Sequence, residues 1–208
     1  MLFRNRIEAG KKLAEKLANY KNKKNVIVLG IPRGGVEVAF SVAKALKAPL
    51  SVVVTKKIGH PFNPELAIGA VSPDNYTIDE DYKDKESYAK KTIKELNAEI
   101  KKRYKLYTKG KLPQLENKTV IVVDDGLATG FTMLAAIKYV KSKRPKKIIV
   151  AVPVAAHDSY EKAKLIADKV ICLHIPLFFS AVGSFYQEFE QLEDEEVKQY
   201  LEEGKKYC

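Results

Sequence analysis

Five short runs of β-branched and other apolar residues recur along this chain and constrain its fold more than any other feature. Runs of this kind are typical of strands buried on both faces of a parallel sheet. Helical patterns lie between them, so the order of elements predicts an α/β fold with ligands at the carboxyl ends of the strands. We predict a parallel sheet of about five strands with helices on both faces. The runs are residues 25–30, 50–55, 120–123, 146–152 and 169–174.

Helices are predicted between and around these runs. The N-terminal helix is amphipathic, with Phe3, Gly10 and Leu17 on its buried side. A long helix from about residue 83 to residue 107 places Ile100 and Tyr104 toward the core. The other predicted helices are residues 36–46, 133–140 and 157–167, and a short β excursion is predicted at residues 66–71 and 76–78.

The third run leads into the most specific motif of the chain. Val120–Val123 is followed by Asp124 and Asp125, and then by the loop Gly126–Thr132 at the start of a predicted helix. Backbone N–H groups at a helix start bind phosphate, and carboxylates accept hydrogen bonds from ribose hydroxyls. The motif therefore indicates a sugar-phosphate site. Two alternatives are an ordinary strand-to-helix turn with acidic caps and a phospho-accepting receiver domain, whose paired acids sit early in the chain.

A second glycine-rich turn, Gly30-Ile-Pro-Arg-Gly-Gly35, also lies between a predicted strand and a predicted helix. Its glycines allow successive N–H groups to converge on one anion, and the Arg33 guanidinium suits a phosphate. The three-glycine spacing of a dinucleotide-binding turn is absent. Alone, this turn is weak, since Pro-Arg-Gly-Gly also suits a plain turn. Together with the acid-pair motif it indicates a second anion site.

These two motifs resemble those of the phosphoribosyltransferase family, type I, whose donor is 5-phosphoribosyl-1-pyrophosphate (PRPP). The layout is similar to that of predicted bacterial phosphoribosyltransferases of unassigned substrate. The resemblance implies that Asp124 and Asp125 hold the ribose hydroxyls and that Arg33, Gly34 and Gly35 form the pyrophosphate loop. It also implies a loop around the 5′-phosphate, made of Gly126, Leu127, Ala128, Thr129, Gly130 and Thr132.

The same resemblance implies a reaction. Ribose 5-phosphate passes from PRPP to a nitrogenous acceptor, a nucleobase or related amine, and pyrophosphate leaves. Mg²⁺ is expected to arrive with PRPP near Asp124 and Asp125, and no direct side-chain ligand of a metal is assigned. Catalysis is assigned to Arg33, Lys56 and Glu65. The alternative is a regulatory protein that senses PRPP without turnover and can bind nucleic acid.

Two features of the middle of the chain are weaker. Lys56 and Lys57 end the second run, either as solvated charges or with one of them on the pyrophosphate, and we favour Lys56 as the catalytic one while Lys57 contacts substrate. The segment 58–65 resembles a mobile lid that shields the reacting centre from water. Within it, His60 and Glu65 are candidates for proton handling or substrate contact, or are simply exposed.

The chain after Pro176 is rich in aromatic residues, which either pack over the core or stack on a nucleobase. By resemblance, an acceptor-binding hood is built from residues 1–20 and 176–208. Phe179, Phe185 and Tyr186 are the predicted acceptor contacts. We predict one phosphoribosyltransferase-like domain over residues 1–208, and a homodimer is open.

The net charge of +11 raises the question of nucleic acid, but its distribution argues against that partner. Residues 81–111 hold 11 basic and 5 acidic residues, so much of the excess lies on one predicted helix. With two cysteines, no long apolar stretch and no secretory signal, neither a disulfide framework nor a membrane association is expected. A cytoplasmic protein of nucleotide metabolism is the resulting expectation.

Overall fold

The core of the protein is a five-stranded parallel sheet with the strand order β2-β1-β6-β7-β8. The computed structural model describes residues 2–73 and 75–207, except for the side chains at positions 64, 65, 75, 77, 80 and 86. Each strand of the sheet lies in one of the five apolar runs, so the predicted fold is confirmed. The strands are β1 (Val26–Gly30), β2 (Leu50–Val52), β6 (Thr119–Val123), β7 (Lys147–Val154) and β8 (Lys169–His174).

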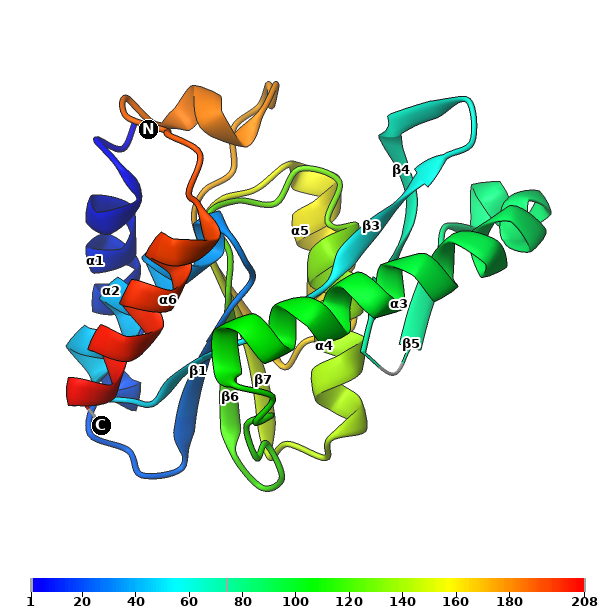
Figure 1. The fold of residues 1–208 in the computed structure, drawn as a ribbon. Coiled ribbons are helices and arrows are strands. Elements are labelled where there is room, and N and C mark those ends of the chain that lie inside the picture. The colour runs from blue at the N-terminus through cyan, green and yellow to red at the C-terminus, as the bar shows by residue number, and fades with distance from the viewer. Residues whose placement is uncertain (1, 74, 208) are drawn as a thin grey trace.

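Helices cover both faces of this sheet (Figure 1). On one face lie α1 (Arg6–Lys16) and α2 (Gly34–Leu46), whose residues Leu13 and Val38 pack on the strands. On the other face lie α4 (Phe131–Ser142) and α5 (His157–Lys164), and Met133 and Ala163 belong to that core. The last helix, α6 (Asp194–Gly204), packs against α2 from outside. The apolar sides of the helices thus bury the sheet from both directions.

A second, antiparallel sheet confirms the predicted β excursion at residues 66–71 and 76–78 and adds an unpredicted strand before it. It consists of β3 (Lys56–His60), β4 (Asn63–Ser72) and β5 (Asn75–Ile78), which we call the flap. The prediction of a loop beginning at residue 58 was wrong, because that segment pairs as β3 with β4 and buries Ile58 between exposed Lys57 and half-buried Gly59. A lysine pair and two glycines within the segment and its partner obscure the alternation that marks a strand.

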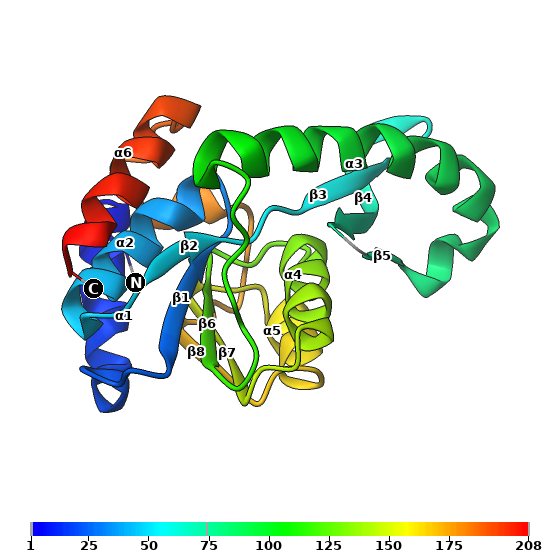
Figure 2. The same cartoon turned by 60° about the horizontal axis from the view of Figure 1, so that its bottom comes forward.

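The flap projects from the edge of the molecule together with the long helix α3 (Glu86–Thr108), as Figure 2 shows. Ile100 and Tyr104 of α3 pack against Ile58 and Ile68 of the flap, and the Tyr104 hydroxyl accepts a hydrogen bond from the Val54 N–H at 3.0 Å. The predicted buried side of this helix is therefore confirmed, and α3 ties the flap to the main sheet.

The strand order places two loops side by side. From β1 the chain crosses through α2 to β2 on one side of the sheet, whereas β6 leads through α4 to β7 on the other. Loops that leave neighbouring strands in opposite directions open a crevice where α/β proteins bind ligands. Gly30 lies opposite Val123, and the Ile31 N–H donates to the Val123 carbonyl at 2.9 Å. Both glycine-rich turns of the sequence therefore start at this point.

The two predicted hood segments also meet. Phe3 pairs in parallel with Tyr186, and its N–H donates to the Phe185 carbonyl at 2.8 Å. Helix α1 packs in the main core through Leu13, and its first turns also contact the C-terminal segment, since Ala9 shares a cluster with Phe3 and Tyr186. Among the helices of the described ranges, none is long and apolar enough to span a membrane.

Candidate functional site

The acid pair lies at the carboxyl end of β6, in direct contact with the turn that follows β1. Asp124 and Asp125 are half-buried, and the Asp125 N–H donates to Asp124 Oδ1 at 2.9 Å. A Cβ atom at Gly35 would lie 2.8 Å from Asp124 Cα, and one at Gly34 would lie 2.0 Å from Asp125 Oδ2. Only glycines allow so close an approach. The structure thus brings the predicted pyrophosphate loop and the predicted ribose ligands together.

The two carboxyl groups differ in their electrostatic environment. Burial, followed by the charge of Asp125, raises the pKa of Asp124 well above its usual value. Burial also raises the pKa of Asp125, but the nearby Arg6 guanidinium opposes that shift. Of the two carboxyl groups, Asp124 therefore holds a proton more readily than Asp125.

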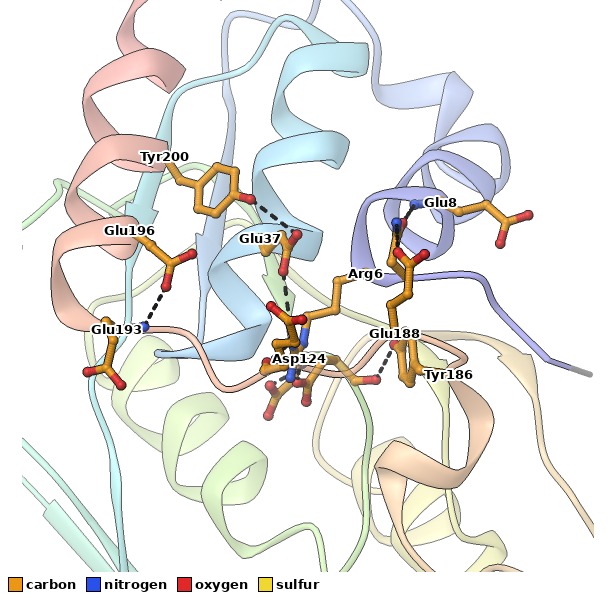
Figure 3. Close-up of polar contacts among 12 residues, drawn as sticks. Arg6, Glu8, Glu37, Asp124, Tyr186, Glu188, Glu193, Glu196 and Tyr200 are labelled. Carbon is orange, nitrogen blue, oxygen red and sulfur yellow. Dashed lines mark hydrogen bonds and ion pairs between the residues drawn. The ribbon is translucent and has the colours of Figure 1, made fainter.

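Arg6, a residue that the sequence analysis missed, is the cation beside this pair (Figure 3). Its Nε lies 2.8 Å from Asp125 Oδ2, and its Nη1 donates to the Glu190 carbonyl at 2.7 Å. The guanidinium stacks 3.9 Å from the centre of the Phe189 ring, and the side chain is 8% exposed. A signal was present, because Arg6 precedes Gly10, Leu13 and Leu17 at spacings of four, three and four on the buried side of the helix.

Glu37 and Tyr200 extend this network to α6. Glu37 Oε2 lies 3.8 Å from Arg6 Nη1, and the Tyr200 hydroxyl donates to Glu37 Oε1 at 3.1 Å. Burial raises the pKa of Glu37. A cavity of about 240 Å³ adjoins these groups. Its lining residues are Asn5, Arg6, Glu37, Glu188, Glu190, Gln191, Leu192, Glu196 and Tyr200.

The predicted phosphate loop follows the acid pair into α4. Its buried residue Leu127 anchors the loop, because its N–H donates to the Val154 carbonyl at 2.9 Å, while Ala128 and Thr129 are exposed. Gly130 has a φ of +80° and caps α4 without a side-chain hydrogen bond. The first N–H groups of α4, including that of half-buried Thr132, therefore have no capping side chain and suit an anion.

Arg33 lies at the start of α2, after a cis peptide bond between Pro32 and Arg33. Its side chain is 22% exposed, and its Nη1 lies 3.2 Å from Glu193 Oε2 at the start of α6. A phosphate near the Gly34–Gly35 turn would compete with Glu193 for this guanidinium, since both are anions that accept from its N–H groups.

The predicted flap residues have contacts of their own. Lys56 Nζ lies 2.8 Å from Glu99 Oε2 of α3, and Lys57 is exposed. The His60 Nδ1 accepts from the Phe62 N–H at 3.2 Å. Glu65 belongs to β4, and its side chain lies outside the described part of the protein. The roles assigned to these residues stay predictions.

The three predicted acceptor contacts lie in the C-terminal segment. Tyr186 is 6% exposed, its hydroxyl donates to the Asp125 carbonyl at 2.7 Å, and its ring stacks on Phe189. Phe179 packs on Phe185 with ring centres 5.5 Å apart. Tyr186 thus positions the backbone of the acid pair, and acceptor contact by these aromatic residues stays a prediction.

Comparison with known proteins places this geometry in context. The crystal structure of TT1426 from Thermus thermophilus is 39% identical, with a TM-score of 0.82, and the match covers 98% of this chain and 99% of that one. A protein from Neisseria gonorrhoeae crystallised with ppGpp is 17% identical, with a TM-score of 0.51 over 98% of both chains, and supports the fold alone.

Rv0571c of Mycobacterium tuberculosis, which is named provisionally as a phosphoribosyl transferase, is 40% identical over 209 residues. The match covers 97% of this chain and 46% of that protein, so the chain spans about half the length of the curated relatives it matches. The family model described as the phosphoribosyl transferase domain matches residues 2–188. The two loops and the acid pair at the β1–β6 crevice thus lie inside the matched region, and the chain belongs to the phosphoribosyl transferase domain family.

Proposed function

We propose that this protein transfers ribose 5-phosphate from PRPP to a nitrogenous acceptor, a nucleobase or related amine, and releases pyrophosphate. The observation that carries the proposal is the contact between the Gly34–Gly35 turn and the Asp124–Asp125 pair. A donor with phosphate groups at both ends of a ribose needs two anion sites flanking hydroxyl acceptors. The β1–β6 crevice offers that arrangement within one family-matched site.

Each part of the crevice has a task in this proposal. The 5′-phosphate binds at the loop 126–132 and the start of α4, and the ribose hydroxyls donate to Asp124 and Asp125. The pyrophosphate lies at the Gly34–Gly35 turn with Arg33. As the acceptor nitrogen forms a bond to C1 of the ribose, the bond to pyrophosphate breaks, and Arg33 offsets the charge that develops on the leaving group. No covalent enzyme intermediate is needed.

The acid pair also fits Mg²⁺ that is carried by PRPP. Mg²⁺ in phosphate sites is usually held by one or two carboxylates together with substrate oxygens, and Asp124 and Asp125 are the carboxylates at this strand end. No group of three or more metal-ligating side chains occurs within the described residues, so substrate oxygens would supply the remaining ligands. When bound, the ion neutralises pyrophosphate charge.

The flap and the C-terminal segment complete the proposal. The flap is the lid, with Lys56 reaching the pyrophosphate after it leaves Glu99, and Lys57 and Glu65 contacting substrate. Residues 1–20 and 176–208 supply a hood within a single domain, with Phe179, Phe185 and Tyr186 toward the acceptor. A cytoplasmic place in nucleotide metabolism agrees with this chemistry.

Binding of PRPP tests the donor half, and a screen for pyrophosphate release tests the transfer. Calorimetric titration of PRPP with and without Mg²⁺ should show saturable binding that depends on the ion. Nucleobases and small amines are then added one at a time, and pyrophosphate is measured. The matched control is Asp124→Asn, which keeps the shape of the side chain. Failure of the wild-type protein to bind PRPP would exclude the proposed function.

A second candidate is a PRPP-sensing regulator that binds nucleic acid without turnover, and one observation favours it. Lys90, Lys94, Lys101 and Lys105 are exposed and fall on one side of α3, at spacings of four, seven and four. Such a stripe suits a phosphate backbone. PRPP binding without pyrophosphate release, together with nucleic-acid affinity that falls steeply with salt, would favour this candidate over the enzyme.

A further inference from the structure

Arg6 is a buried cation whose partners come from three distant parts of the chain. It contacts Asp125 at the end of β6, Glu37 in α2 and the Glu190 carbonyl in the C-terminal segment. The neighbouring arginine, Arg4, is 72% exposed and pairs with exposed Glu188. Burial of a guanidinium is costly unless its hydrogen bonds are satisfied. The Arg6 side chain is therefore stable only in the position where it meets these partners.

The contact leaves Asp125 able to bind a ligand. Arg6 Nε approaches Oδ2 alone, whereas a carboxylate offers about four acceptor positions. The same guanidinium closes in on the Gly34 turn, since a Cβ atom at Gly34 would lie 2.8 Å from Arg6 Nε. Arg6 therefore packs against Asp125, the proposed ribose ligand, and against Gly34 in the proposed pyrophosphate turn.

The charges around Asp125 show why a cation is needed there. Asp124 lies beside it on the β6 loop, Glu37 faces it from α2, and Tyr186 places a hydroxyl on its carbonyl from the C-terminal segment. Of the described groups that face Asp125, these are acidic or neutral, and Arg6 is the cation. Arg6 thus offsets the negative charge that the carboxyl groups bring to the end of β6.

We propose that Arg6 is the positioning residue of the donor site, holding the Asp125 carboxylate oriented toward the ribose hydroxyls. It is itself held by the segment 189–190 through Phe189 and the Glu190 carbonyl, so the C-terminal segment takes part in donor binding. This inference rests on the proposed function. Arg6 acts through Asp125 and needs no contact with PRPP.

The test compares Arg6→Gln with Arg4→Gln, which removes the same charge from the same segment but at an exposed position. We expect Arg6→Gln to weaken PRPP·Mg²⁺ binding about 10- to 100-fold, as for a hydrogen bond to a charged group, and Arg4→Gln to stay within about twofold. Because Arg6 acts through Asp125, adding Arg6→Gln to Asp125→Asn should weaken PRPP·Mg²⁺ binding much less than adding it to the wild type.

Two further measurements keep the test decisive. Arg6→Lys retains the cation without the fork, so it should recover only part of the affinity, and it serves if Arg6→Gln does not fold. A double-mutant cycle of Arg6→Gln with Asp125→Asn in urea unfolding should show that the two side chains are coupled. Wild-type affinity in a folded Arg6 variant would overturn the inference. Absence of PRPP binding by the wild type would instead refute the proposed function, and the unfolding cycle would still decide whether Arg6 acts on Asp125.

Discussion

The two sides of the crevice are built in different ways. On the donor side, Gly34 and Gly35 press against the acid pair, and a buried arginine fills the space behind it. On the proposed acceptor side, Phe62 of the flap is 88% exposed and Leu177 and Phe178 of the C-terminal segment are 97% and 92% exposed. The proposed donor side is thus fixed by packing from several elements, whereas the flap and the C-terminal segment present exposed apolar side chains. The difference suits the roles proposed for them, a constant donor site and a lid that opens.

The largest effect is expected from Gly35→Ala, which breaks the donor side directly. The new Cβ atom would lie 2.8 Å from Asp124 Cα and 2.9 Å from the Val123 carbonyl oxygen, so backbone must move. We expect loss of PRPP binding and a fall of about 1–3 kcal/mol in the free energy of unfolding, as for overpacking. Gly110→Ala is the control, because nothing lies within 4 Å of that position and only its positive φ adds a cost. Equal PRPP affinity in both variants would contradict the close approach.

Asp124→Asn separates binding from stability on the same side. Its affinity for PRPP should fall at least about tenfold, since bound PRPP·Mg²⁺ favours the charged carboxylate and Asn cannot adopt that form. Burial raises the pKa of Asp124 in the folded state, so folding retains a proton there that the unfolded chain has released. The wild type therefore loses stability as pH rises from the unfolded pKa through the folded pKa, and the variant does not.

Urea unfolding at pH 5 and pH 9 measures this second effect. The difference in the free energy of unfolding, Asp124→Asn minus wild type, should be larger at pH 9 than at pH 5. It should grow by about 1.4 kcal/mol for each pH unit in this interval over which Asp124 is ionised in the unfolded chain and still protonated in the folded protein. A stability difference that stays constant from pH 5 to pH 9 would show that Asp124 is already charged in the folded protein at pH 5 and would contradict the raised pKa.

Tyr186→Phe tests the link between the two sides at smaller cost. The variant removes the hydroxyl that donates to the Asp125 carbonyl and keeps the ring against Phe3 and Phe189. We expect a loss of about 1 kcal/mol in unfolding free energy and a several-fold loss of PRPP affinity. Tyr20→Phe, in the 3₁₀ turn Ala18–Tyr20 that follows α1, is the comparison. An affinity loss of equal size in both variants would rule out the positioning role of the Tyr186 hydroxyl.

The smallest effect is expected from Leu177→Ser combined with Phe178→Ser. Both side chains are almost fully exposed, so their removal should change the free energy of unfolding by less than about 0.5 kcal/mol and leave PRPP affinity unchanged. Calorimetric titration and urea unfolding check both values. A marked loss of stability would mean that this loop is packed in solution and that the contrast between the two sides is smaller than the structure indicates.

The sheet could be predicted because its strands are buried on both faces and read as continuous apolar runs. The acid-pair loop and the Gly34–Gly35 turn could be located for the same reason, since each directly follows such a run. Strand β3 could not be predicted, because it is stabilised by pairing with β4 and by packing against α3, and its own residues do not reveal either contact. Lys56 was expected near the crevice, and its ion pair with Glu99 depends on where α3 lies.

Arg6 is a residue whose contacts could not be predicted from the sequence. A cation on the buried side of an amphipathic helix is visible in the sequence, but its partners are 119 and 184 positions away. Periodicity describes neighbours along one helix and carries no information about such pairs. The electrostatics of the acid pair were therefore out of reach until the fold was known.

The large sequence separation between Arg6 and its partners also sets an order of events during synthesis. A ribosome delivers the chain from its N-terminus at about 5–20 residues per second. A nascent chain can form α1 and β1 early. The Arg6 guanidinium, however, has no Glu190 carbonyl to bind until 184 further residues have been added. Contacts this distant in sequence form late. A nascent chain thus completes the surroundings of Asp125 only after the segment around Glu190 has been made.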